Sequence, residues 1–374
     1  MQPSVHIAPG LPSNVQRVLA SRLVTALAAP HGVDRYLELF HPLWSLAEVR
    51  AEVVAKIPET PDAVTLRLCP NRNWRGFEAG QYVRLTLELG GVRRTRCYSL
   101  SSSAHRTDGL VDLSVKRHSG GQVSASLIRT VRVGQVVVLS QAEGRFTLPM
   151  QRPPRILFVS GGSGITPCMA MLRTLRDEGY AGRITFLHYA PSYDAILFHA
   201  ELVEIAAHCP NVDVRFALTR ELPRGDDLAG RFSPAQLEAV APDSRACETY
   251  LCGPPGLLDA VWATWREAGI EPRLHVERFT GSVSAASEGG SGGRIRFARS
   301  ERHVTSDGRT LLAQAEAAGL EPESGCRMGI CMTCKCRKRT GSVKNLVSGR
   351  ISSDEDEDIQ LCVSVPLGDV TLDL

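Results

Sequence analysis

The chain has 374 residues, which is too long for one ordinary globular domain and predicts two or three. It is 43% hydrophobic and 22% charged, close to the globular average, and this composition excludes wholesale disorder and fibrous repeats. The formal net charge of +3, from 43 basic and 40 acidic residues, is too balanced for a dedicated nucleic-acid-binding protein.

Residues 1–49 predict a helical N-terminal arm. Ser13 and Gln16 have capping-box spacing, apolar residues then recur at helical spacing, and Pro30 ends the pattern. An apolar and aromatic segment follows at residues 36–44. We expect the arm to pack on the next domain, with peripheral contact to a membrane or a partner as the alternative. No apolar run approaches the ~20 residues that span a bilayer, and no signal-peptide pattern is present, so we expect a cytoplasmic protein.

In residues 50–150 the apolar residues recur with a period of two instead of at helical spacing. Four segments alternate in this way, at residues 64–68, 82–89, 110–115 and 136–139, and glycines separate them. Many short strands with regular turns predict an antiparallel β-barrel.

Residues 151–280 alternate apolar strands with helical patterns, which predicts an α/β domain with a doubly wound parallel sheet. Residues 281–293 consist largely of Gly and Ser and predict a flexible linker. Residues 294–374 form a third unit, into which five of the eleven cysteines are crowded.

The cysteine spacing predicts a metal cluster. Cys326, Cys331 and Cys334 have four and two residues between them, and Cys362 follows after 27 more. This is the plant-type [2Fe–2S] spacing, whereas structural zinc, the alternative, favours paired C-x2-C motifs and only one such pair occurs here. Cys336 is a fifth cysteine that the four-ligand count leaves out.

Arg96-Cys-Tyr98-Ser99, at the end of a predicted strand, suits a flavin. Arginine supplies a forked donor for a pyrophosphate, Tyr98 offers a flat face for the ring, and the Ser99 hydroxyl can hydrogen-bond a ring nitrogen. Gly121-Gln-Val-Ser124 predicts a helix N-terminus that would hold a phosphate. An ordinary strand followed by a polar turn is the alternative.

Gly161-Gly-Ser-Gly-Ile-Thr-Pro167 follows a buried strand and opens a helix, so it predicts a dinucleotide site, although the spacing is not strict G-x-G-x-x-G. Cys252-Gly-Pro-Pro-Gly256 follows a late strand of the same sheet, at the edge where ligands bind. Thr219-Arg220 ends the strand before it, and Arg220 is either a solvated charge or a clamp for the 2′-phosphate of NADPH.

These motifs, in this order, resemble the ferredoxin–NADP reductase superfamily fused to a C-terminal plant-type ferredoxin domain of α+β, β-grasp fold. The resemblance covers residues 50–374, and the arrangement of modules looks like the phthalate dioxygenase reductase type and the reductase branch that serves bacterial oxygenases and desaturases. The segment Tyr36–Trp44 of the arm also resembles reductases that supply membrane acyl-CoA desaturases.

The resemblance implies a role for particular residues. Flavin contacts would come from Arg96, Tyr98 and Ser99, with Ser99 beside the reactive nitrogen. The pyrophosphate would be held by Gly121, Gln122, Val123 and Ser124, and this segment favours FAD over FMN. The nicotinamide site would comprise Gly162, Gly164, Thr166 and Cys252, with Thr219 and Arg220 on the 2′-phosphate. Phe279 would cover the flavin ring.

The resemblance also implies one electron path, from NADPH to FAD, then to the [2Fe–2S] cluster, and finally to a partner on another chain. The favoured partner is a membrane fatty acyl-CoA desaturase. The alternatives are a Rieske oxygenase, a cytochrome P450 or an alkane hydroxylase, and, from another class, a redox sensor without turnover. The basic run at residues 335–344, beside the cluster, is expected to steer an acidic acceptor or anionic lipid.

Overall fold

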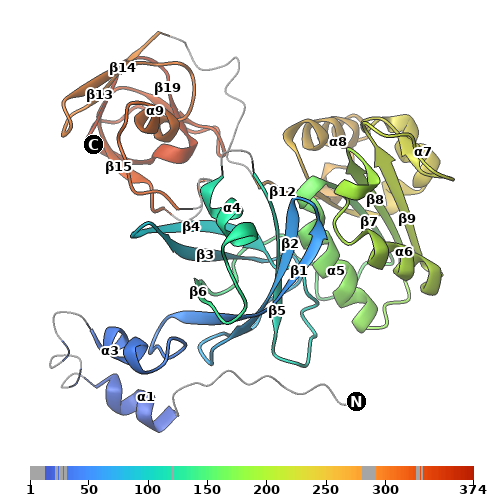
Figure 1. Ribbon diagram of the computed structural model, residues 1–374. Helices are drawn as coiled ribbons and strands as arrows, with labels where there is room; N and C mark the ends of the chain where they lie inside the picture. The colour runs from blue at the N-terminus through green and yellow to red at the C-terminus, as the bar shows by residue number, and fades with distance from the viewer. Residues whose placement is uncertain are drawn as a thin grey trace. The chain divides into compact units, whose positions relative to one another are not determined.

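The computed structural model describes the following residues: 13–21, 24, 28, 32–118, 121–279, 292–325, 329 and 332–374 (Figure 1). They form two compact units, one running to Arg278 and one from Phe279 to the end of the chain, with residues 94–96 grouped with the second. Within the described residues, no helix has the length and apolar character that a membrane crossing needs.

The N-terminal arm contains helices α1 (Ser13–Leu19) and α3 (Val33–Phe40). Helix α3 packs on the segment that leads into the first strand, through Val33 and Leu37. The carboxylate of Asp34 fixes this packing, because it accepts hydrogen bonds of 2.7 Å from the Leu46 N–H and from the Ser45 hydroxyl. Helix α3 therefore packs within the arm, and the expected contact with the next domain comes from Leu43, which is buried with Cys69 and Leu110.

The flavin-type domain is a six-stranded antiparallel sheet in the order β4-β3-β6-β1-β2-β5, with helix α4 (Gln122–Arg129). Its strands are β1 (Val49–Thr60), β2 (Ala63–Pro70), β3 (Tyr82–Leu89), β4 (Val92–Ser99), β5 (Val111–Lys116) and β6 (Val136–Leu139). A bridge between Leu100 and Leu113 joins the end of β4 to β5 and closes the barrel. Alternate side chains such as Leu66, Leu68 and Leu85 are fully buried inside it, which is why the period of two predicted these strands.

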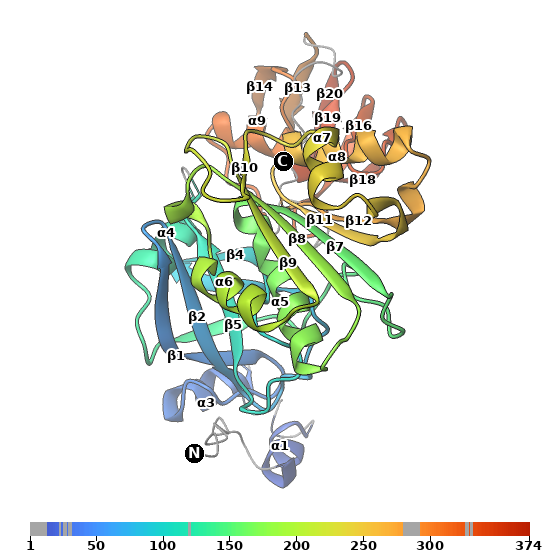
Figure 2. The same ribbon diagram turned by 90° about the vertical axis from the view of Figure 1, so that its right-hand side faces the viewer.

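The nicotinamide-type domain is a parallel sheet in the order β10-β9-β8-β7-β11-β12 (Figure 2). Its strands are β7 (Arg155–Gly161), β8 (Arg183–Ala190), β9 (Val212–Leu218), β10 (Leu228–Ala229), β11 (Glu248–Cys252) and β12 (Leu274–Glu277). Its helices are η1 (Gly162–Gly164), α5 (Ile165–Asp177), η2 (Tyr193–Ala195), α6 (His199–His208), α7 (Pro234–Val240), η3 (Ser244–Ala246), α8 (Pro255–Glu267) and η4 (Glu271–Arg273). The strand order reverses at β7, which lies between β8 and β11, and the carboxyl end of such a switch point is where ligands bind.

The second unit contains a five-stranded sheet, β14-β13-β20-β15-β18, and a three-stranded sheet, β17-β16-β19. Its elements are β13 (Arg294–Phe297), β14 (Arg302–Thr305), α9 (Leu311–Ala317), β15 (Lys335–Thr340), β16 (Val343–Asn345), β17 (Ile351–Ser352), β18 (Glu357–Gln360), η5 (Leu361–Val363), β19 (Ser364–Pro366) and β20 (Val370–Leu372). Ile295, Phe297 and Leu311 are fully buried in its core, so helix α9 packs against the sheet. The predicted linker lies almost wholly outside the described residues.

The basic run after the cysteine loop does not form a free positive edge. Strand β15 carries it and pairs with β18, which carries part of the acidic run, so that Arg337 lies opposite Asp358. Lys335 and Arg337 form ion pairs of 2.7 Å and 3.0 Å with Asp358. Lys338 is fully buried, and its ammonium group donates a hydrogen bond of 2.8 Å to the Gly341 carbonyl and another to the Asp354 carbonyl. The expectation of a steering surface is wrong for these residues, because the acidic strand neutralises them and Lys338 is part of the core.

Candidate functional site

The predicted flavin residues lie at the end of strand β4. Ser99 is the last residue of the strand and is 5% exposed, and the next residue, Leu100, fills the barrel core. Because side chains alternate along a strand, Ser99 lies on the outer face of the barrel. Tyr98 is partly buried against the barrel core, and the guanidinium of Arg96 donates a hydrogen bond of 2.7 Å to the Thr95 carbonyl.

The predicted pyrophosphate segment forms the N-terminus of helix α4, with Gly121 as its N-cap. The Ser124 hydroxyl accepts a hydrogen bond of 3.1 Å from the His118 N–H and donates one of 3.3 Å to the Gly121 carbonyl. The side chain of Val123 is 1% exposed in the barrel core, so only its backbone N–H is available to a ligand. Unpaired N–H groups at a helix N-terminus fit the pyrophosphate of FAD.

The two predicted nicotinamide motifs meet at the switch point. Gly161 ends β7, and a Cβ atom on Gly164 would lie only 2.2 Å from the carbonyl oxygen of Cys252. Only glycine permits this approach of the two loops. The Thr166 hydroxyl donates a hydrogen bond of 3.0 Å to the Ser163 carbonyl, which fixes the loop just before α5. The predicted proximity of the two motifs is therefore present.

Cys252 is completely buried at the end of β11. Burial, first, and the nearby Cys168 and Glu277 raise the pKa of its thiol well above the ordinary value. The side chain is therefore a neutral thiol at physiological pH, suited to shaping a ring pocket and not to nucleophilic attack.

Glu277 is a functional candidate that sequence reasoning missed. The parallel register of β11 and β12 places it directly beside Cys252, and burial raises the pKa of its carboxyl to about 7. A titratable group with such a pKa, next to a residue predicted to flank the nicotinamide, is suited to sensing or moving a proton. The only sequence signal was its place two residues before Phe279, because strand register cannot be deduced from composition.

Replacement of Glu277 by Gln should remove a titration near pH 7 from the flavin-reduction profile. The native carboxyl is neutral below its raised pKa of about 7 and ionised above it, whereas glutamine is neutral throughout. Stopped-flow reduction by NADPH from about pH 5.5 to about pH 8.5 measures the profile. An unchanged inflection in the variant would assign the titration to another group.

The raised pKa of Glu277 also makes the stability of the folded protein depend on pH. The native carboxyl holds its proton between 4.5, the unfolded value, and about 7, so the wild type should lose stability as the pH rises through this window. The Gln variant should show no such loss in urea unfolding at the two ends of the window.

Thr219 and Arg220 lie exposed immediately after β9. The Thr219 N–H donates a hydrogen bond of 2.9 Å to the Ala190 carbonyl, and the Arg220 N–H donates one of 3.0 Å to the Pro191 carbonyl, so the backbone of the turn is fixed. Within the described part of the chain, the guanidinium of Arg220 has neither an ion pair nor a hydrogen bond. A fixed turn that presents an uncommitted guanidinium fits a phosphate.

Two of the four predicted cluster ligands, Cys326 and Cys331, lie outside the described residues. The other two, Cys334 and Cys362, are each 3% exposed. Their segments are joined directly, because the Leu361 N–H donates a hydrogen bond of 3.1 Å to the Cys334 carbonyl. Two buried cysteines on hydrogen-bonded segments far apart in sequence fit the plant-type arrangement, in which a distant thiolate closes the cluster.

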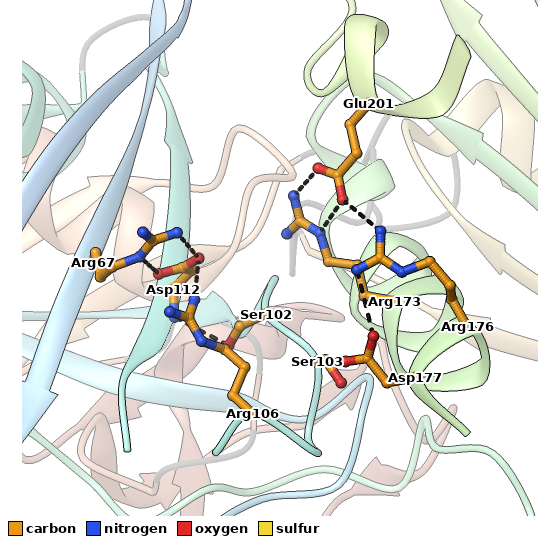
Figure 3. Close-up of a pocket in the computed structure, with 9 residues that line it drawn as sticks. All are labelled: Arg67, Ser102, Ser103, Arg106, Asp112, Arg173, Arg176, Asp177 and Glu201. Carbon is orange, nitrogen blue, oxygen red and sulfur yellow. Dashed lines mark hydrogen bonds and ion pairs between the residues drawn. The ribbon is translucent and has the colours of Figure 1, made fainter. Parts of the chain in front are cut away.

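A charged pocket of about 300 Å³, unpredicted from the sequence, lies between the barrel and helix α5 (Figure 3). Its guanidinium groups are already paired with carboxylates: Arg67 and Arg106 with Asp112, and Arg173 with Glu201. The pocket is therefore a polar interface between the flavin-type and nicotinamide-type domains. Phe279 begins the C-terminal segment of the second unit, and its place over the flavin remains a prediction.

Comparison with known proteins defines the class. The sequence pattern of the oxidoreductase FAD-binding domain matches residues 51–148, that of the oxidoreductase NAD-binding domain residues 158–263, and that of the 2Fe-2S iron-sulfur cluster binding domain residues 295–367. The protein is thus an oxidoreductase whose cofactors are FAD, NAD(P)H and a [2Fe–2S] cluster.

The chain belongs to the ferredoxin–NADP reductase superfamily, in the branch that carries a C-terminal ferredoxin domain. It is 37% identical to an NADPH oxidoreductase of Mycobacterium tuberculosis, over 96% of this chain and 92% of that protein. It is 30% identical to the stachydrine N-demethylase reductase subunit of Rhizobium meliloti, over 88% and 97%. The solved structure of phthalate dioxygenase reductase superimposes with a TM-score of 0.56 and 26% identity, over 87% of this chain and 98% of that one.

Proposed function

We propose that the protein is the NADPH-dependent reductase component of an oxygenase system. One observation supports this proposal: the chain has a site suited to each of three redox groups. These sites are the N-terminus of α4 on the barrel, the closely packed loops at Gly164 and Cys252, and the hydrogen-bonded segments of Cys334 and Cys362. When bound, the cofactors supply the redox chemistry: a hydride passes from NADPH to FAD, and its two electrons leave singly through the cluster.

The residues of the chain bind and orient these groups. Ser99 would offer its hydroxyl to the flavin ring, and Arg96 and the N-terminus of α4 would hold the FAD pyrophosphate. Gly162, Gly164 and Thr166 would admit the dinucleotide, and the buried side chain of Cys252 would line the nicotinamide site. Cys326, Cys331, Cys334 and Cys362 hold the cluster. None of these roles needs a nucleophile, in agreement with the raised pKa of Cys252.

The relatives favour an oxygenase as the acceptor. Two of them are described as reductase subunits of stachydrine N-demethylase and glycine betaine monooxygenase, and one of the similar solved structures is phthalate dioxygenase reductase. None of the relatives cited here is described as a desaturase reductase. The acyl-CoA desaturase favoured by the sequence is therefore less well supported than its alternative.

The proposal is tested in two stages. Anaerobic titration should consume about 1.5 equivalents of NADPH per chain, because FAD takes two electrons and the cluster one. A redox sensor without turnover would not support rapid reduction of cytochrome c or ferricyanide by NADPH. The acceptor is then decided by coupling the holoprotein to purified oxygenases in solution and to a desaturase in phospholipid vesicles. Product formation with the desaturase alone would contradict the oxygenase proposal.

A further inference from the structure

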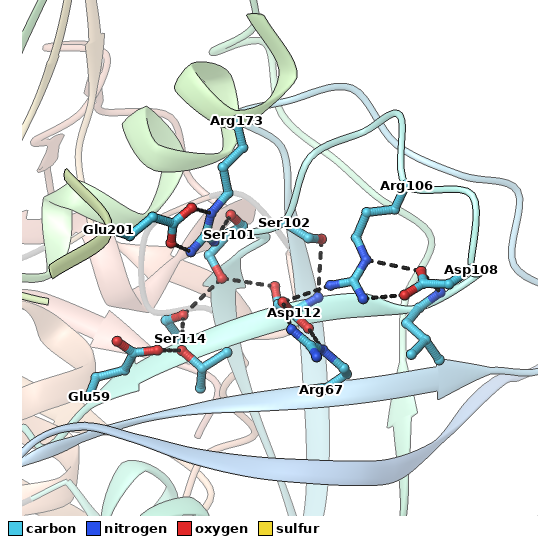
Figure 4. Close-up of polar contacts among 12 residues, drawn as sticks. Glu59, Arg67, Ser101, Ser102, Arg106, Asp108, Asp112, Ser114, Arg173 and Glu201 are labelled. Atoms are coloured by element: carbon cyan, nitrogen blue, oxygen red, sulfur yellow. Dashed lines mark hydrogen bonds and ion pairs between the residues drawn. The ribbon is translucent and has the colours of Figure 1, made fainter. Parts of the chain in front are cut away.

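Arg173 of helix α5 binds the flavin-type barrel directly. One of its terminal nitrogens donates a hydrogen bond of 2.5 Å to the Ser101 carbonyl. Its Nε donates to Glu201 of α6 at 2.9 Å and its other terminal nitrogen donates to the second Glu201 oxygen. The guanidinium also lies over the ring of Phe198, 4.6 Å from its centre. With 13% side-chain exposure, the group is held on several sides (Figure 4).

The barrel segment that receives this hydrogen bond is itself fixed from the barrel side. The Ser101 N–H donates to the Asp112 carbonyl at 2.8 Å, and the Ser101 hydroxyl lies 2.8 Å from that of Ser114 (Figure 4). Thr174, next to Arg173 on the helix, accepts a hydrogen bond of 3.0 Å from the Ala104 N–H. Two consecutive residues of α5, Arg173 and Thr174, are therefore hydrogen-bonded to residues 101–104 of the barrel. We call this pair of contacts the clasp.

The two ends of this clasp lead to the two halves of the proposed hydride-transfer site. Ser101 is two residues beyond Ser99, so the carbonyl that Arg173 binds belongs to the segment that directly follows the flavin strand. Arg173 is seven residues beyond Thr166, which is two helical turns and the same face of α5. A helix transmits a displacement at one end to the other, so the clasp sets how Thr166 lies relative to Ser99.

We propose that Arg173 is a positioning residue for hydride transfer, which holds the nicotinamide loop and the flavin strand in register across the domain junction. The inference rests on the proposed function, since it needs Ser99 and Thr166 to face the two rings. Arginine suits the task because its planar fork binds a carboxylate with two donors and leaves a third for the carbonyl.

The test variant is Arg173→Ala in the FAD-loaded, full-length protein. Because a misplacement of ~1 Å can cost about a hundredfold in rate, we expect flavin reduction by NADPH to slow by about tenfold or more. Affinity for NADP⁺ should change little, because Arg173 is not in the phosphate site. The long-wavelength charge-transfer absorption that stacked flavin and nicotinamide rings produce should weaken, and amide hydrogen exchange at residues 99–104 should accelerate.

Two further variants separate positioning from general damage. Arg176→Ala is the matched control, because Arg176 lies one turn away and pairs with Glu201 at 3.7 Å and Asp177 at 3.4 Å, but has no bond to the barrel among the described contacts. It should behave as wild type in all four measurements. Arg173→Lys, which can still reach the Ser101 carbonyl, should recover part of the rate and of the charge-transfer band.

The outcomes are decisive in either direction. A wild-type reduction rate and charge-transfer band in Arg173→Ala, or a loss confined to NADP⁺ affinity, would overturn the proposal. If Arg173→Ala does not fold or retain FAD, Thr174→Val removes the neighbouring bond to Ala104 and must slow reduction in the same direction. Failure of wild-type protein to reduce its flavin with NADPH would instead overturn the proposed function.

Discussion

Cys362→Ser should eliminate the visible absorbance of the [2Fe–2S] cluster while the flavin spectrum remains. Cys362 is 3% exposed in the short helix η5, and the N–H of its neighbour Leu361 donates a hydrogen bond to the Cys334 carbonyl, so Cys362 lies on a segment joined to that of a second predicted ligand. A serine hydroxyl is a poor substitute for a thiolate ligand. NADPH-driven reduction of ferricyanide should persist, because the flavin alone can deliver electrons to it. Electron delivery to the proposed oxygenase partner should stop.

Cys336→Ser is the matched control for the cluster. Cys336 is also buried, at 7% exposure, and lies two residues after Cys334 on strand β15. The four-ligand count leaves Cys336 out, and its thiol donates a hydrogen bond of 3.7 Å to the Arg337 carbonyl, so we expect cluster content equal to the wild type. A full cluster in Cys362→Ser, or a missing one in Cys336→Ser, would show that the ligand set is misassigned.

The fold was predictable where local patterns and burial agree. Apolar and polar residues alternate along strands β2, β3, β5 and β6 because one face of each strand fills the barrel. The glycine loop before α5 predicts a strand–loop–helix unit. The longest strand, β1 (Val49–Thr60), is absent from the predicted set. Its first half does alternate, with Val49, Ala51 and Val53 buried in the barrel, so this part of the strand was open to prediction. Its second half is mostly half-buried and contains Pro58, which weakens the strand pattern.

Features that depend on pairing between distant segments were not predictable. The basic run looked like a docking surface because its sequence neighbours are also basic, yet β18 brings Asp358 against Lys335 and Arg337. Glu277 became a candidate only when the register of β11 and β12 placed it beside Cys252. The Arg173 clasp likewise joins segments 72 residues apart. A single sequence gives spacing within a segment, but not which segments will meet.

Arg220→Ala should weaken the use of NADPH by about tenfold or more and leave NADH nearly unchanged, because a hydrogen bond to a charged group is worth about 1.5–3 kcal/mol. Arg220 follows β9 at the carboxyl edge of the sheet, and its backbone is fixed by a hydrogen bond to the Pro191 carbonyl. The 2′-phosphate distinguishes the two coenzymes, so only NADPH can lose this contact. The measurement is kcat/KM for ferricyanide reduction with each coenzyme.

Two controls define what the result means. Arg220→Lys keeps the charge but not the fork and should fall between wild type and Arg220→Ala. Arg266→Ala removes an exposed arginine in the last turn of α8, and, because α8 follows β11, this turn lies toward the opposite edge of the sheet. It should not alter the coenzyme preference. Equal kcat/KM for NADPH and NADH in the wild type, or an equal loss with both coenzymes in Arg220→Ala, would refute the 2′-phosphate clamp, since a clamp on that phosphate cannot act on NADH.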